Sequence, residues 1–203
     1  MTKIALFGTS ADPPTIGHQA IIDWLADAFT KVVVWAANNP FKTHAAALED
    51  RQQMLALLID DLRYSDRQVG LYPELSDSKT LISVRRAKQL WPQASLTLVL
   101  GADVISTLPH WYCAEALFEQ VELLVLKRPE VSLSASAVAI LQEQTQFEIA
   151  DFEGPPVSSS HYRQTGDGGE LTPAIATYIR QHHLYVWKQA TSTSRAAIAS
   201  SQP

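Results

Sequence analysis

The chain has 203 residues, of which 46% are hydrophobic and 18% are charged, and its net charge is -5 at pH 7. This length suits a single domain with a sizeable core, and the apolar fraction excludes an intrinsically disordered chain. The acidic balance argues against a general nucleic-acid binder, no apolar run is long enough to span a membrane, and the lone Cys113 excludes an internal disulfide, so we expect a cytoplasmic protein.

Short apolar runs alternate with amphipathic stretches along the chain. Residues 4–7 form a continuous apolar run, typical of a strand that is buried on both faces. After it, apolar side chains recur at helical spacing from Ile21 to Phe29. Further strands are predicted at 32–35, 69–72, 96–100, 121–126 and 147–149. Further helices are predicted from near Glu49, at 80–90, around 114–119, at 135–142 and at 173–183. The alternation predicts an α/β fold, Rossmann-like and doubly wound, with a mainly parallel sheet and helices on both faces.

The chain shows no internal repeat and no linker, so we predict one domain over residues 1–188. Residues 189–203 are rich in Ser, Thr and Ala and lack an amphipathic stripe. Such termini seldom pack on a core, and we therefore expect a disordered C-terminal tail.

Residues 8–18 (GTSADPPTIGH) directly follow the first predicted strand. Ligands of open parallel sheets bind beyond the carboxyl ends of the strands. Gly8 lets a ligand approach the backbone, hydroxyl residues follow it, and the next helix begins near His18 with amides that favour an anion. The same residues also fit a plain strand-to-helix turn with Thr15 as the N-cap, and composition does not decide between the two.

Two familiar phosphate motifs are missing from the chain. Neither G-x-x-x-x-G-K-[ST] nor a G-x-G-x-x-G after the first strand is present. Their absence disfavours a P-loop kinase and an ordinary dinucleotide-binding dehydrogenase.

A second polar cluster lies far downstream, at residues 157–163 (VSSSHYR). Its three serines follow two prolines and precede a predicted helical turn, which makes them good capping residues. Their hydroxyls, the helix amides and the Arg163 guanidinium can converge on a triphosphate. A capped surface helix with a solvated arginine is the alternative.

Four further residues have two interpretations each. Asp103, just past the strand at 96–100, can accept hydrogen bonds from ribose hydroxyls or cap the next helix. Lys42 can reach a substrate phosphate or remain solvated, and Trp111 can stack on a flat ring or pack in the core. Thr80 can lie near a bound nucleotide or simply cap the helix at 80–90.

The two polar clusters resemble known motifs. GTSADPPTIGH resembles the G-G-T-F-D-P-x-H-x-G-H signature of the nucleotidyltransferase superfamily, and VSSSHYR resembles its I-S-S-T-x-x-R. With LGAD at 100–103 and LPHWY at 108–112, the pattern is similar to that of nicotinate-nucleotide adenylyltransferases, in matching order along most of the chain. Thr9, Ala11 and Thr15 stand where relatives have Gly, Phe and commonly His, so His18 is the only histidine of its loop.

The resemblance implies transfer of AMP from ATP to nicotinate mononucleotide, or to nicotinamide mononucleotide, in NAD biosynthesis. It implies that His18 and Arg163 are catalytic. It implies ATP binding by Gly8, Thr9, Ser10, Thr15, Gly17, His18, Gly101, Asp103, Ser158, Ser159, Ser160 and Arg163. It implies mononucleotide binding by Ser10, Lys42, Thr80 and Trp111.

The same resemblance implies Mg²⁺ carried by the ATP phosphates, without a protein metal site, and allows a homo-oligomer. Two alternatives stay open. One is a phosphopantetheine adenylyltransferase, although those chains are usually shorter and lack the Trp111 segment. The other is a non-catalytic nucleotide sensor that has kept the fold, which the altered residues Ala11 and Thr15 permit.

Overall fold

A computed structural model describes residues 2–39, 42–63, 68–127 and 134–185 of the chain. The predicted tail at 189–203 lies outside these residues. Among them, no helix is long and apolar enough to cross a membrane.

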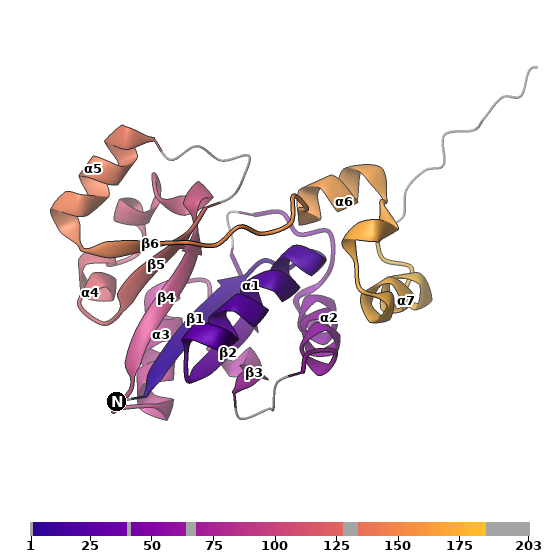
Figure 1. Cartoon of the computed structure of the whole chain (residues 1–203), viewed down its shortest axis with the longest axis horizontal. Coiled ribbons are helices and arrows are strands. Elements are labelled where there is room, and N and C mark those ends of the chain that lie inside the picture. The colour runs from indigo at the N-terminus through magenta and orange to yellow at the C-terminus, as the bar shows by residue number, and fades with distance from the viewer. Residues whose placement is uncertain (1, 40–41, 64–67, 128–133, 186–203) are drawn as a thin grey trace, which may run out of the picture.

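The centre of the molecule is a six-stranded sheet with the strand order β3-β2-β1-β4-β5-β6 (Figure 1). Every neighbouring pair is parallel. The strands are β1 (Lys3–Thr9), β2 (Lys31–Ala36), β3 (Val69–Leu71), β4 (Ser95–Gly101), β5 (Glu122–Leu126) and β6 (Phe147–Ala150). This order reverses direction between β1 and β4, which is the doubly wound Rossmann-like arrangement, and the predicted fold is confirmed.

Helices cover both faces of the sheet. They are α1 (Ile16–Ala28), α2 (Leu48–Asp60), α3 (Thr80–Leu90), α4 (Ala114–Phe118), α5 (Ala135–Gln144), α6 (Ser159–Thr165) and α7 (Pro173–Gln181). Side chains of a strand point alternately to its two faces. On β1, Ala5 and Phe7 pack with α1, α2 and α7, whereas Ile4 and Leu6 pack with α3, α4 and α5. The apolar run that predicted a strand buried on both faces is thereby explained.

The predicted strands and helices are all present, with most ends shifted by a few residues. Within the described residues, four short 3-10 helices were not predicted. They are η1 (Pro73–Leu75), η2 (Ala102–Val104), η3 (Leu108–His110) and η4 (Gly168–Glu170). Three-residue turns of this kind carry too little periodicity to stand out in a sequence.

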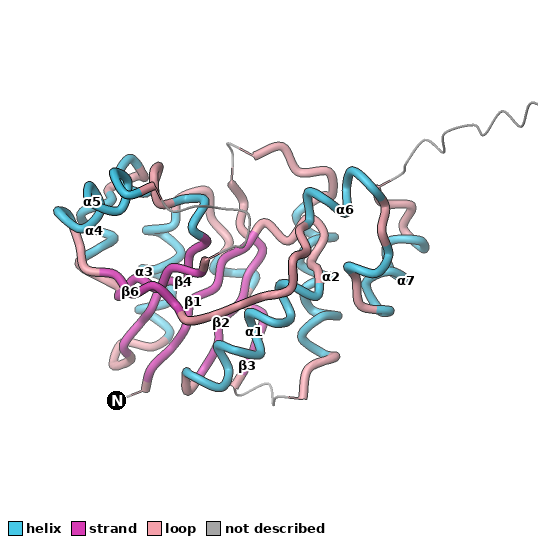
Figure 2. The backbone as a smooth tube through the Cα atoms, turned by 45° about the horizontal axis from the view of Figure 1, so that its top comes forward, coloured by secondary structure: helices cyan, strands magenta, loops and turns pink. Residues whose placement is uncertain are grey.

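The connection after β6 determines where the C-terminal helices lie. Residues 151–158 run from the outer strand β6 across the molecule to the side that carries α2 (Figures 1 and 2). This path brings α6 beside the loop that follows β1, and α7 packs near α2. Two segments that are distant in sequence therefore meet at the carboxyl edge of the sheet.

Gly8 is required by packing within the protein. Gly8 pairs with Trp35 across β1 and β2, and the buried indole of Trp35 covers the position of a missing side chain. A Cβ on Gly8 would lie 2.5 Å from Cζ2 of Trp35. From the sequence, we expected Gly8 to let a ligand approach the backbone. In the structure, the group that approaches Gly8 closely is the indole of Trp35.

We expect Gly8→Ala to lower the free energy of unfolding by about 1–3 kcal/mol, because the added methyl group overpacks the core against Trp35. Urea denaturation followed by tryptophan fluorescence measures this. Gly168→Ala is the matched control, since a Cβ on Gly168 meets nothing within 4 Å. Equal stability of the two variants would contradict the packing role.

Candidate active site

The candidate site lies at the carboxyl edge of the sheet, where β1 and β4 are neighbours. The chain leaves β1 toward α1 on one face and leaves β4 toward η2 on the other face. Connections that depart to opposite faces open a crevice at this point in α/β sheets. In this chain the loop after Thr9 and the segment after Gly101 flank that point.

The imidazole of His18 is held at both ring nitrogens. The backbone N–H of Thr15 donates to Nδ1 at 3.1 Å, and the Thr15 hydroxyl lies 3.0 Å from the same nitrogen. Because a backbone N–H can only donate, Nδ1 is the unprotonated nitrogen, and the neutral ring carries its proton on Nε2. Nε2 lies 3.0 Å from Oγ1 of Thr9, at the end of β1. The arrangement points an N–H donor at the edge of the sheet.

Thr15 is the N-cap residue of α1, and the residue is only 1% exposed. Its hydroxyl faces His18 inside the protein. Thr15, at a position where relatives commonly have histidine, thus orients the histidine that this chain retains. The turn interpretation and the ligand interpretation of the loop are compatible, because the residue that caps the helix also fixes the ring.

A buried arginine from α2 holds the loop after β1. Arg51 is 2% exposed, and its Nη1 donates to the carbonyl oxygens of Ser10 at 2.7 Å and Ala37 at 3.0 Å. Burial lowers the pKa of Arg51, while the charge of Asp12 acts in the opposite direction. An arginine begins from so high a pKa that it keeps its charge here.

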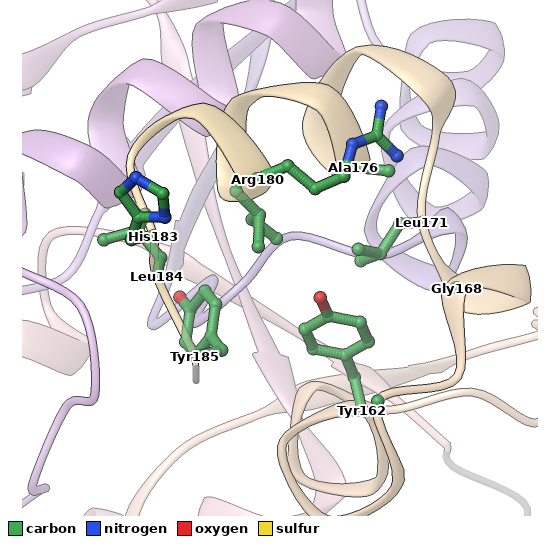
Figure 3. Close-up of a pocket in the computed structure, with 10 residues that line it drawn as sticks. Tyr162, Gly168, Leu171, Ala176, Arg180, His183, Leu184 and Tyr185 are labelled. Carbon is green, nitrogen blue, oxygen red and sulfur yellow. The ribbon is translucent and has the colours of Figure 1, made fainter. Parts of the chain in front are cut away.

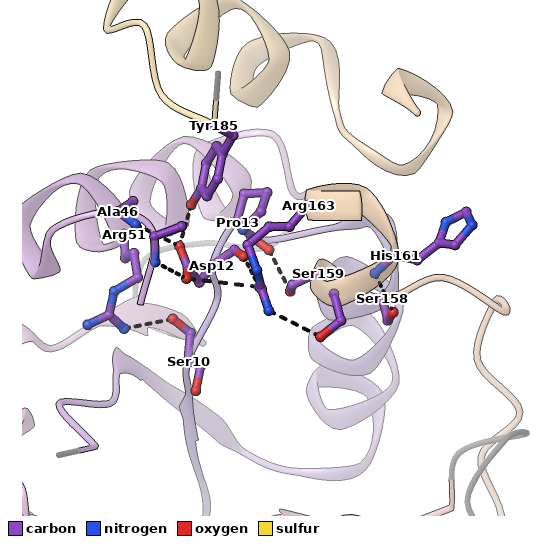
Figure 4. A network of polar contacts seen from close by, with 12 residues as sticks. Ser10, Asp12, Pro13, Ala46, Arg51, Ser158, Ser159, His161, Arg163 and Tyr185 are labelled. Carbon is purple, nitrogen blue, oxygen red and sulfur yellow. Dashed lines mark hydrogen bonds and ion pairs between the residues drawn. The ribbon is translucent and has the colours of Figure 1, made fainter. Parts of the chain in front are cut away.

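Asp12 is the centre of a polar network that joins three parts of the chain (Figure 4). Its side chain is 3% exposed. Oδ2 accepts from the backbone N–H of Ala45 at 2.7 Å, and Oδ1 accepts from that of Ala46 at 3.1 Å. Oδ1 also accepts from the hydroxyl of Tyr185 at 2.6 Å. A buried carboxylate needs such donors, because its charge has lost water.

The second motif docks directly on the first. Nη1 of Arg163 donates to the backbone carbonyl of Asp12 and lies 3.9 Å from Oδ2 of the same residue. Nη2 of Arg163 donates to Oγ of Ser160 at 3.2 Å. Ser159 donates from Oγ to the carbonyl of Pro13 at 2.8 Å. The structure therefore brings the two predicted motifs together, with the Arg163 side chain still 32% exposed.

Ser158 and Gly17 complete this junction. Ser158 caps α6, and its Oγ accepts from the backbone N–H of His161 at 3.1 Å. Gly17 lies in the first turn of α1, where a Cβ would come within 3.1 Å of Cγ2 of Val157. The absence of a side chain at Gly17 lets the start of α1 approach the segment that leads into α6.

The predicted site residues Gly101, Asp103 and Lys42 lie on three separate segments. Gly101 ends β4, and Asp103 is exposed within η2. Asp103 is thus inside a 3-10 turn, so the alternative that it caps the next helix is wrong. Lys42 is exposed, and its backbone N–H donates to the carbonyl of Asn39 at 3.3 Å.

Thr80 and Trp111 come from two elements that meet. Thr80 is the first residue of α3 and Lys79 is its N-cap, so the alternative that Thr80 caps this helix is wrong. Trp111 follows η3 and is partly buried against the core. The ammonium of Lys79 lies 4.2 Å from the ring centroid of Tyr112, which joins the start of α3 to the segment after η3.

Sequence reasoning missed Asp12, Arg51 and Tyr185, which take part in the polar contacts of Figure 4, and His44, which lies near them. Asp12 lies inside the first motif, which was the available signal for it. His44 is close enough to sense the charges of Arg51 and Asp12, and burial is the main cause that lowers its pKa. Its Nε2 is buried without a hydrogen-bond partner.

A cavity of about 410 Å³ lies beside this network, between α6 and α7 (Figure 3). Its lining is mainly apolar and includes Tyr162, Leu171, Ile179 and Tyr185. The cavity is separate from the edge of the sheet where His18 lies, and Tyr185 is the residue that it shares with the Asp12 network.

The chain matches a model of the family described as cytidylyltransferase-like over residues 6–165. It is 41% identical over 198 residues to a Synechocystis sp. protein named "Probable nicotinate-nucleotide adenylyltransferase", covering 90% of this chain and 98% of the relative. A Geobacillus kaustophilus protein of the same name is 30% identical, with 98% of this chain and 95% of the relative covered. The chain belongs to the nicotinate-nucleotide adenylyltransferase family, within the cytidylyltransferase-like proteins.

Solved structures of this family share the fold. The Plasmodium falciparum nicotinic acid mononucleotide adenylyltransferase complexed with NaAD superimposes with a TM-score of 0.76 at 18% identity, covering 91% of this chain and 98% of that one. The same enzyme complexed with APC gives a TM-score of 0.74 at 19% identity, over 91% and 98% of the two chains. At this identity the likeness concerns the fold, and the resemblance seen in the two motifs is confirmed by the closer relatives.

The lowered pKa of His44 predicts that the free energy of unfolding falls in mild acid. The folded state binds this proton less well than the unfolded chain, so stability is lost as the pH falls below about 6.5 toward the lowered value. We expect His44→Gln to lose less free energy of unfolding than the parent between neutral and mildly acidic pH, measured in urea. His110→Gln, at an exposed histidine of η3, should behave like the parent.

Proposed function

We propose that the chain transfers AMP from ATP to nicotinate mononucleotide, forming the pyridine dinucleotide and pyrophosphate in NAD biosynthesis. The observation that carries this proposal is the docking of Arg163 on the loop that contains His18, at the switch point of the sheet. Membership of the family supports the same reaction. The names of the relatives and the NaAD complex of the Plasmodium enzyme agree with it.

The reaction needs positioned charges and no covalent nucleophile. An oxygen of the acceptor's 5′-phosphate attacks the α-phosphorus of ATP in line, the new P–O bond forms, and the bond to the pyrophosphate oxygen breaks. Nε2–H of His18 donates to a non-bridging oxygen of the α-phosphate. Arg163 stabilises the charge that develops on the departing pyrophosphate.

The remaining ATP contacts follow from the elements that surround the crevice. The amides of the first turn of α1, which begins after Thr15 and includes Gly17, face an anion at the positive end of the helix. The backbone of Gly8 and the polar residues Thr9 and Ser10 lie at the end of β1. Across the crevice, Gly101 leaves room for the nucleoside and Asp103 accepts from the ribose hydroxyls. Ser159 holds α6 against the loop, Ser158 caps this helix, and Ser160 accepts from the Arg163 side chain, so the three serines lie around the guanidinium that faces the triphosphate.

The acceptor is placed on the side of α3 and η3. Ser10 and Lys42 hold the acceptor's phosphate, Trp111 stacks on the pyridine ring, and Thr80 lies near the ring at the start of α3. The contact of Lys79 with Tyr112 supports this arrangement, since it shows that the two acceptor segments meet. It also puts a positive charge beside them, which favours the carboxylate of nicotinate over the amide of nicotinamide.

Mg²⁺ fits this site as a companion of ATP. The ion prefers oxygen ligands and keeps several waters, and it neutralises charge on the triphosphate when bound. Asp12 is a poor ligand for such an ion, because its side chain is only 3% exposed and already accepts from Ala45, Ala46 and Tyr185. We therefore assign the ion to phosphate oxygens and water. We place the reaction in the cytoplasm, where the exposed Cys113 stays reduced, and a homo-oligomer stays a prediction.

We expect His18→Ala to lower kcat by about 100-fold or more, because it removes a donor aimed at the α-phosphate. Thr15→Val should lower kcat by about 5-fold, since one hydroxyl contact to Nδ1 is lost and the backbone contact stays. Coupled detection of pyrophosphate measures both. Thr145→Val, whose hydroxyl donates to the carbonyl of Gln146 just after α5 and away from the site, is the control and should match the parent. Activity of His18→Ala within a few-fold of the parent would overturn the role of this ring.

The choice of acceptor separates the alternatives. Purified protein is incubated with Mg²⁺, ATP and, in turn, nicotinate mononucleotide, nicotinamide mononucleotide and phosphopantetheine. We expect fastest pyrophosphate release with nicotinate mononucleotide. Release only with phosphopantetheine would refute the proposed acceptor, and ATP binding without release for any acceptor would identify a sensor.

A further inference from the structure

The described chain ends beside the loop that carries the first motif. Tyr185 follows α7, yet its hydroxyl donates to Oδ1 of Asp12 at 2.6 Å (Figure 4). Its ring packs edge-on against Tyr162 of α6, with centroids 5.8 Å apart and planes at 83°. One side chain therefore contacts both the motif loop and the helix that supplies Arg163.

The hydroxyl of Tyr185 is a permanent donor. Burial raises its pKa far above the ordinary value, and the hydrogen bond and charge of Asp12 act in the same direction. The phenol is therefore protonated at neutral pH and acts as the donor to Asp12. A protonated phenol beside a buried carboxylate makes a charge-assisted hydrogen bond, which is stronger than a neutral one.

Asp12 links Tyr185 to the loop that contains Ala45 and to the guanidinium of Arg163. Its Oδ2 accepts from Ala45, in the loop that also contains Lys42 and His44. Its backbone carbonyl accepts from Arg163, and its carboxylate lies within ion-pair distance of the same guanidinium. A rotation of the Asp12 side chain would disturb the Ala45 contact and the ion pair, because both use Oδ2.

We propose that Tyr185 is a positioning residue of the adenylyl transfer, which fixes Asp12 and thereby holds the guanidinium of Arg163 in place for the triphosphate. The inference rests on the proposed function, and it extends the active site to the C-terminal end of the described chain. Tyr185 itself touches no substrate in this scheme. Its effect reaches the reacting atoms through Arg163.

The test is a double-mutant cycle in kcat between Tyr185→Phe and Arg163→Ala. Tyr185→Phe keeps the ring that packs on Tyr162 and removes only the donor. We expect it to lower kcat by about 10-fold in the parent, because a displaced arginine stabilises the departing pyrophosphate less well. In the Arg163→Ala background we expect no further loss of kcat. The free energy of unfolding should fall by the same amount in both backgrounds, which separates positioning from stability.

Tyr178→Phe is the matched control. Tyr178 lies in α7 and donates its hydroxyl to Oδ1 of Asp50 at 2.9 Å, so the same atom is removed from a contact with a carboxylate away from the site. This variant should keep the parent kcat. An equal loss of kcat in Tyr178→Phe, or an undiminished effect of Tyr185→Phe without Arg163, would overturn the proposal.

Two further measurements keep the test decisive. If Tyr185→Phe does not fold at the assay temperature, Asp12→Asn replaces it in the cycle. We then expect Asp12→Asn to lower kcat in the parent and to leave kcat unchanged in the Arg163→Ala background. Additive losses of kcat would refute the proposal. Absence of pyrophosphate release from the parent with every acceptor would refute the proposed function instead. In that case the same cycle is measured with the Kd for ATP, by calorimetry. We expect Tyr185→Phe to raise this Kd only when Arg163 is present, and additive changes in Kd would refute the positioning role.

Discussion

A single buried carboxylate organises the candidate site. Asp12 is nearly inaccessible to solvent, so its charge must be satisfied by protein donors, and these come from the loop after β2, from α6 and from the end of the described chain. Removing one donor leaves a buried charge short of a partner, which costs more than the hydrogen bond alone contributes. This requirement adds to the apolar packing of α2, α6 and α7 and to the bond from Ser159 to Pro13, which join the same segments.

The network and the histidine perform different tasks in the proposed reaction. The Asp12 network fixes where the cation of Arg163 lies, whereas the backbone of Thr15 fixes which nitrogen of His18 carries the proton. Both are forms of preorganisation, in which donors are oriented before the substrates arrive and need not reorganise during the reaction. The contacts of Thr15 fix the orientation of the His18 ring, the only histidine of the first motif.

The candidate site was predictable where its residues form compact motifs. His18 and Arg163 lie in two recognisable stretches, and the alternation of apolar runs predicted the sheet that brings strand ends to one edge. The roles of Gly8 and Tyr185 were not predictable. Trp35 covers Gly8 from the neighbouring strand, and Tyr185 reaches Asp12 from 173 residues away. The capping alternative for Thr80 failed for a smaller reason, because a shift of one residue in the start of a helix changes which residue caps it, and Asp103 lies two residues after the N-cap of its 3-10 turn.

Local patterns of the sequence therefore determined the elements, the fold class and the two motifs, because periodicity and capping act between residues that are close along the chain. Only the tertiary structure decided which donors surround Asp12. That choice depends on the path of residues 151–158 across the molecule and on the packing of α6 and α7 near α2, which no local pattern encodes. The serines at the start of α6 illustrate the division: the sequence predicted a helix cap, which Ser158 provides, and the fold brought Ser159 to the carbonyl of Pro13, 146 residues away in the chain.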